Sequence, residues 1–109
     1  MHDAYKFTVY SNHGYGRGPT IAAAATMQQR QDPDGEIVRL TERNEQGHEE
    51  EIEIPPHDML AARLLDHAHA DVWDAICALR VAARLSKRSD IERIAKQLDD
   101  LHTKLDALP

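Results

Sequence analysis

The last part of the chain carries apolar residues at alternating intervals of three and four positions. These residues are Ile91, Ile94, Leu98, Leu101, Leu105 and Leu108. Such heptad spacing places them in one narrow stripe of a helix, and a stripe of this kind packs against another helix. The pattern therefore predicts a C-terminal helix whose role is association rather than chemistry.

A second long helix is expected immediately before it. Residues 58–85 contain no glycine or proline, and their composition favours a helix throughout. The connection at residues 86–88 is short and polar, and Ser89 and Glu92 have the Ser-x-x-Glu spacing of a capping box. Two long helices joined by so short a link form an antiparallel hairpin. We therefore expect a helical hairpin over residues 57–109.

The first half of the chain has the pattern of a small antiparallel sheet. Strands are expected at residues 5–11, 36–43 and 49–54, where β-branched and aromatic residues or alternating apolar residues occur. The last two flank Asn44–Gly47 and are expected to form a β-hairpin with one apolar and one acidic face.

An Ala-rich segment lies between the first two of these strands. It begins at Ile21, after Thr20 as a plausible N-cap, and ends before Asp32, so it is expected to be a helix. Asn12–Gly18, just before it, contains three glycines and is expected to be a loop.

Together these elements predict an α+β protein. It would have a small three-stranded antiparallel sheet with one Ala-rich helix, followed by a long C-terminal helical hairpin, in the order β-α-β-β-α-α. We expect a single domain over residues 1–109, with a sheet-containing part at 1–56 and the hairpin at 57–109.

The acidic residues are concentrated in the middle of the chain. The formal net charge is −6, whereas residues 32–56 alone carry nine acidic residues and two arginines, a net charge of −7. Glu49, Glu51 and Glu53 alternate along one expected strand face, so we predict that this face contacts a basic protein surface. The alternative is that the glutamates only protect an exposed strand from aggregation. Tyr15 and Arg17, in the expected glycine loop, are further candidates for partner binding.

The glycine loop offers an alternative function. Gly14, Gly16 and Gly18 follow an expected strand and precede a helix, as in loops that bind phosphate. However, the segment lacks the lysine of a P-loop, and Pro19 stands where a dinucleotide-binding fingerprint has its third glycine. We therefore expect no nucleotide to bind here, while a ligand-binding or enzymatic module using this loop remains an alternative.

The sequence predicts no catalytic residue, cofactor or metal site. Two sets of residues that share a helix face could approach each other in the hairpin: His67, Asp71 and Asp74, and Asp99, His102 and Asp106. No metal-binding motif accompanies them, so a solvated polar face is the better interpretation. Cys77 lies in an apolar helical stripe, where a thiol is usually inert.

Basic residues at the corner of the hairpin provide another alternative, a nucleic-acid-binding protein. Arg80, Arg84, Lys87 and Arg88 cluster there, with Arg93 and Lys96 nearby. Cations at the C-terminus of a helix are also stabilised by its dipole, and no aromatic RNA-recognition motif is present. We therefore do not expect nucleic acid to be the partner.

Size and composition point to association with other proteins. The chain has 109 residues, few aromatic residues and many alanines, so a second copy would add buried apolar area. One cysteine, no membrane-spanning apolar run and no secretion signal predict a cytoplasmic protein without membrane contact.

The sequence thus predicts a homodimeric, non-catalytic protein-binding regulator or inhibitor. One such role is that of anti-CRISPR proteins, by which a phage or mobile element inhibits a nucleic-acid-handling complex. The expected dimer interface consists of Ile91, Ile94, Leu98, Leu101, Leu105 and Trp73.

Overall fold

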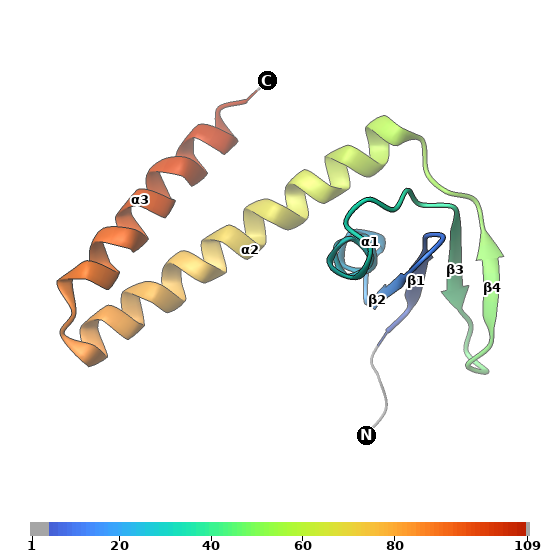
Figure 1. Cartoon of the computed structure of the whole chain (residues 1–109), viewed down its shortest axis with the longest axis horizontal. Coiled ribbons are helices and arrows are strands. Elements are labelled where there is room, and N and C mark those ends of the chain that lie inside the picture. Colours follow the sequence, from blue (N-terminus) through green and yellow to red (C-terminus); the bar gives the residue numbers. More distant parts are fainter. Residues whose placement is uncertain (1–4, 109) are drawn as a thin grey trace. The chain divides into compact units, whose positions relative to one another are not determined.

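A computed structural model describes residues 5–108 (Figure 1). The elements are β1 (Phe7–Tyr10), β2 (Tyr15–Gly18), α1 (Ile21–Gln31), β3 (Arg39–Arg43), β4 (Glu49–Ile52), α2 (His57–Ser86) and α3 (Ser89–Asp106). The chain divides into two compact units, and the boundary between Leu64 and Leu65 falls inside α2. The first unit contains the sheet and α1, and the second contains most of α2 and all of α3.

The first unit confirms the α+β class but not the number of strands. Its sheet has four strands in the order β2-β1-β3-β4, and every neighbouring pair is antiparallel. The prediction of three strands was therefore wrong, and the order of elements is β-β-α-β-β-α-α. The additional strand is β2, which occupies most of the segment expected to be a loop.

Close packing explains why this glycine-rich segment is a strand. A Cβ atom on Gly16 would collide with the backbone of α1 at Gln28 and Ala24. One on Gly18 would lie 2.8 Å from the Cβ atom of Ala23. The glycines therefore let β2 lie directly against α1. The prediction of a loop at these residues was wrong.

The core of the first unit lies between the sheet and α1. Val9 and Leu40 are opposite each other on β1 and β3 and pack with Ala24 and Ala25 of α1. The predicted N-cap of α1 is confirmed, because the Thr20 hydroxyl accepts a hydrogen bond from the backbone N–H of Ala23 (3.1 Å). The small alanine side chains allow this helix to approach the sheet closely.

The predicted β-hairpin is also confirmed. β3 and β4 pair around a turn in which the Asn44 side chain accepts hydrogen bonds from the N–H groups of Gln46 (3.0 Å) and His48 (2.9 Å). Gly47 has φ 85°, a left-handed conformation that favours glycine. The turn sets the register that brings Thr41 opposite Glu51.

The second unit is the predicted helical hairpin. Arg80 of α2 forms an ion pair with Asp99 of α3 (2.8 Å), and the buried Ile76, Ala83 and Ala95 form its small interior. The expected capping box at Ser89 was wrong. The N-cap of α3 is Arg88, whose side chain makes no capping bond, and Ser89 already belongs to the helix.

The turn between the two helices explains this shift. Lys87 has φ 56°, so the chain reverses at that residue. Arg88 then donates two hydrogen bonds to Asp90 (3.1 and 2.6 Å), which holds the start of α3. Asp90 also accepts a hydrogen bond from the N–H of Ile91 (3.0 Å).

Within residues 5–108, no helix combines the length and the apolar character that crossing a membrane requires.

Candidate functional site

One face of the sheet is lined by polar and aromatic side chains. α1 packs on the opposite face, so alternation along the strands directs these side chains away from the core. We call them the polar face: Thr8, Tyr10, Tyr15, Arg17, Arg39, Thr41, Glu49 and Glu51. All four strands contribute to this surface.

Glu49 of β4 contacts one residue from each of the other three strands of the polar face. Its carboxylate accepts hydrogen bonds from the Thr41 hydroxyl (2.7 Å) and the Tyr10 hydroxyl (3.0 Å), and Nη2 of Arg17 lies 3.8 Å away. The hydrogen bond from Thr41 is the main cause that lowers the pKa of Glu49, while partial burial opposes it. The pKa of Tyr10 is raised, first by burial and then by the neighbouring Glu49 carboxylate.

The lowered pKa of Glu49 predicts an acid-dependent loss of stability. The ionised form is favoured in the folded chain, so its contribution is complete above the ordinary value of 4.5 and is lost as the pH falls through the lowered pKa. We expect Glu49→Gln to lower the free energy of unfolding by about 1 kcal/mol at neutral pH and by less at acidic pH. Urea titrations along a pH series measure this difference. Exposed Glu53→Gln is the control, and equal pH profiles of the two variants would contradict the assignment.

Arginine and tyrosine side chains stack across the polar face. The Arg17 guanidinium lies over the rings of Tyr5 (4.7 Å) and Tyr15 (5.0 Å), and that of Arg39 lies over Tyr10 (5.1 Å). Each stack holds a flexible arginine in one orientation by a cation–π interaction. The surface therefore presents ordered arginine and tyrosine side chains.

The structure brings together four of the five predicted partner-binding residues. Tyr15, Arg17, Glu49 and Glu51 belong to the polar face, whereas Glu53 follows the end of β4. Glu49 and Glu51 form ion pairs with Arg17 (3.8 Å) and with Arg39 (2.9 Å). Arg39 was not predicted as a site residue, although the register of the hairpin places it diagonally across from Glu51. The negative charge of Glu49 and Glu51 is therefore partly compensated within the sheet.

The glycines of β2 now have a structural role, and our prediction that they bind no nucleotide stays untested. A nucleotide at roughly a hundred times its Kd would stabilise the protein by about 2.7 kcal/mol. We expect ATP, GTP, NAD and FAD to leave the unfolding temperature unchanged in a thermal-shift assay. A clear increase with any of them would revive the ligand-binding alternative.

The expected dimer interface is split into two parts. Ile91, Leu98 and Leu105 are half-buried, whereas Ile94, Leu101 and Leu108 are 54%, 59% and 64% exposed. We call these three exposed residues the apolar row. Ile94 and Leu101 are seven residues apart and thus lie on one side of α3, whereas Leu108 follows the C-terminal end of that helix.

The apolar row faces away from the polar contacts of the hairpin. Ile94 and Leu101 lie about 140° and 160° around the helix axis from Asp99, which pairs with Arg80. Trp73 lies with that polar side: its ring is 5.6 Å from the Arg80 guanidinium and 5.9 Å from the ring of His102. Trp73 is thus separated from the apolar row.

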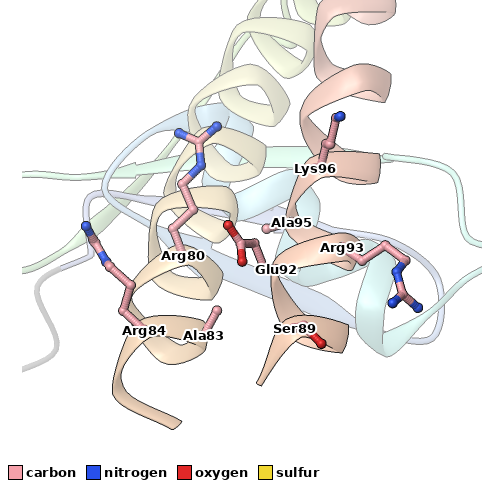
Figure 2. Close-up of a pocket in the computed structure, with 8 residues that line it drawn as sticks. All are labelled: Arg80, Ala83, Arg84, Ser89, Glu92, Arg93, Ala95 and Lys96. Carbon is pink, nitrogen blue, oxygen red and sulfur yellow. The ribbon is translucent and has the colours of Figure 1, made fainter. Parts of the chain in front are cut away.

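A groove lies at the corner of the hairpin (Figure 2). Its volume is about 650 Å³. We call it the basic groove, and it is lined by Arg80, Ala83, Arg84, Ser89, Glu92, Arg93, Ala95 and Lys96. It contains four of the basic residues noted in the sequence, Arg80 and Arg84 from α2 and Arg93 and Lys96 from α3.

The histidine and aspartate sets do not assemble into a metal site within residues 5–108. His67 instead pairs with Asp71 (3.1 Å), and His69 lies 3.7 Å from Asp106. Cys77 is half-buried and is not part of a disulfide.

Three surfaces of the described part of the chain are thus suited to binding: the polar face, the apolar row and the basic groove. Arginine, tyrosine and exposed leucine side chains dominate them. These are side chains that recognise other molecules by contact and charge.

Comparisons with protein-family models, with curated proteins and with solved structures found no match for this chain.

Proposed function

We propose that this protein is a homodimeric, non-catalytic binding module that acts as a regulator or inhibitor of another protein. Two copies associate through the apolar row of their hairpins, and the polar face of each sheet contacts the target. The observation that carries the proposal is the exposure of Ile94 and Leu101 on one side of α3 and of Leu108 just beyond its end. Several exposed apolar side chains in one region of a surface mark an interaction site.

The composition of the hairpin supports a second copy as the occupant of the apolar row. The interior of one hairpin is small, since two of its three buried apolar residues are alanines. Two helical hairpins that pack through heptad positions form a four-helix bundle, which buries the remaining apolar residues. The same heptad is present in both copies, so a two-fold axis would bring the apolar row of one copy against that of the other.

The arginine and tyrosine side chains of the polar face support its proposed role as the target-binding surface. Both are enriched among the residues that contribute most to protein–protein affinity. Arg17 is held between Tyr5 and Tyr15, so less side-chain entropy is lost when a partner binds. The ion pairs with Glu49 and Glu51 keep this surface close to neutral, which favours a target of mixed charge.

The dimer is tested by making the apolar row polar. We expect the double substitution Ile94→Gln and Leu101→Gln to give a monomer that keeps its helical circular-dichroism signal, measured by sedimentation velocity. Leu85→Gln, which changes an 81% exposed leucine outside the row, should leave the dimer intact. A double variant that sediments like the wild type would contradict the proposed interface.

A target held by the polar face should depend on Tyr15. We expect a cross-linked partner to be lost from the Tyr15→Ala variant in a pull-down from the native host. The matched control is Met59→Ala, which shortens a similarly exposed side chain in the first turn of α2. Equal recovery of the partner by both variants would exclude the polar face as the target-binding surface.

A further inference from the structure

In contrast to the expectation from the sequence, we propose that the basic groove at the hairpin corner binds the phosphodiester backbone of single-stranded nucleic acid. The local charge provides the first argument. Residues 80–96 contain six basic and two acidic residues, a net charge of +4, in a chain whose net charge is −6. A concentration of one sign against the overall charge creates a local field that attracts polyanions.

Within the part of the chain that the structure describes, most of these cations have no acidic partner. Arg80 pairs with Asp99, whereas Arg84, Arg93 and Lys96 form no ion pair within residues 5–108. The polar face differs, since Arg17 and Arg39 are each matched by a glutamate. Three cations that line one groove without partners repel one another, and an anion would relieve that repulsion.

The helix dipole explains only part of the cluster. Arg84 lies in the last turn of α2, where the dipole stabilises a positive charge. Arg80 lies outside that turn, and Arg93 and Lys96 lie beyond the first turn of α3, where the dipole has little effect on a cation. The dipole therefore accounts only for Arg84 among the cations that line the groove, whereas a bound polyanion would stabilise all of them.

The directions of the side chains favour a polymer over a single small anion. Figure 2 shows Arg80 and Arg84 extending from α2, the Glu92 carboxylate directed toward α2, and Arg93 on the side of α3 away from α2. One phosphate could not contact all of these cations. A chain of phosphates that crosses both helices could contact them in turn.

The exposed position of Trp73 beside the groove favours a single-stranded nucleic acid as the ligand over a duplex or an acidic protein. Its indole ring is 45% exposed and lies against the Arg80 guanidinium, which also lines the groove. Exposed aromatic rings beside a cationic groove stack with unpaired bases, and this combination is typical of single-strand binding. Bases within a duplex are already stacked on each other and have no face available for Trp73.

Fluorescence anisotropy with a labelled single-stranded oligonucleotide of mixed sequence tests the proposal. With three phosphate contacts, we expect the affinity to fall about 20-fold between about 50 and 200 mM salt. Trp73 is the only tryptophan, so quenching of tryptophan fluorescence by the unlabelled oligonucleotide reports on this side of the hairpin. An absence of binding at low salt would overturn the proposal.

Charge changes locate the site. The double variant Arg84→Glu and Arg93→Glu should weaken binding by about tenfold or more and make the salt dependence shallower. Lys104→Glu makes the same kind of change near the C-terminus of α3 and should have little effect. Glu92→Gln should tighten binding, a gain that misfolding could not produce. Equal losses in the groove variant and the Lys104 control, or weaker binding by Glu92→Gln, would overturn the assignment.

Two competitors distinguish the class of polyanion. A duplex of the same sequence and a poly-glutamate peptide should both bind more weakly than the single strand at the same salt concentration. Equal binding of the duplex would overturn the role of base stacking, and equal binding of poly-glutamate would indicate an acidic protein instead. Because none of these variants alters the apolar row, loss of binding with an intact dimer separates this proposal from the proposed function.

Discussion

Gly16→Ala is expected to unfold the sheet-containing unit. The new Cβ atom would lie 2.7 Å from the carbonyl carbon of Met27 and would collide with backbone atoms at Ala24 and Gln28. Backbone atoms of a helix cannot move aside as a side-chain end can, so β2 would have to leave α1. We expect a loss of more than about 4 kcal/mol, a large part of the stability of a small domain. Urea unfolding monitored by circular dichroism measures it.

Gly14→Ala is the matched control for this substitution. Its nearest neighbour would be the Cβ atom of Asp32 at 3.1 Å, a side-chain atom that can shift by a few tenths of an ångström. The loss should therefore be much smaller. If both variants were equally stable, β2 would not pack against α1 as described, and residues 15–18 would again be interpreted as a loop.

Leu98→Asp is expected to have the second largest effect. Leu98 is half-buried between the helices of the hairpin, next to the exposed apolar row. A carboxylate at this half-buried position would lose much of its hydration. We expect a loss of about 3 kcal/mol and dissociation of the dimer, measured by chemical unfolding and by sedimentation.

The neighbouring Gln97→Asp variant separates position from charge. Gln97 is exposed, so the same new charge should leave both stability and association nearly unchanged. A folded oligomer of unchanged size in Leu98→Asp would show that the heptad stripe does not support the hairpin or its association.

Local patterns predicted most of the fold because each depends on near neighbours. The spacing of Ile91 and Leu98 indicated the last helix, and Asn44–Gly47 indicated the β-hairpin. Both signals act through interactions within a few residues. β2 could not be predicted in this way. Gly16 is needed because α1 lies against it, and that contact becomes visible only when the chain is folded.

The same distinction applies to the candidate surfaces. The alternation of Glu49 and Glu51 correctly placed them on one strand face. It did not identify their ion-pair partners Arg17 and Arg39, because these come from other strands. The capping box at Ser89 failed because the left-handed turn at Lys87 shifted the start of α3. The pairing of side chains across elements therefore required the structure.

Sedimentation equilibrium of the unmodified chain over a hundredfold range of concentration tests the central claim most directly. We predict a mass twice that of the chain at high concentration, with dissociation to the monomer on dilution. The transition should move to much higher concentration when Ile94 and Leu101 are both replaced by glutamine. A wild-type chain that remains monomeric throughout, with its helices intact, would contradict dimerisation through the hairpin.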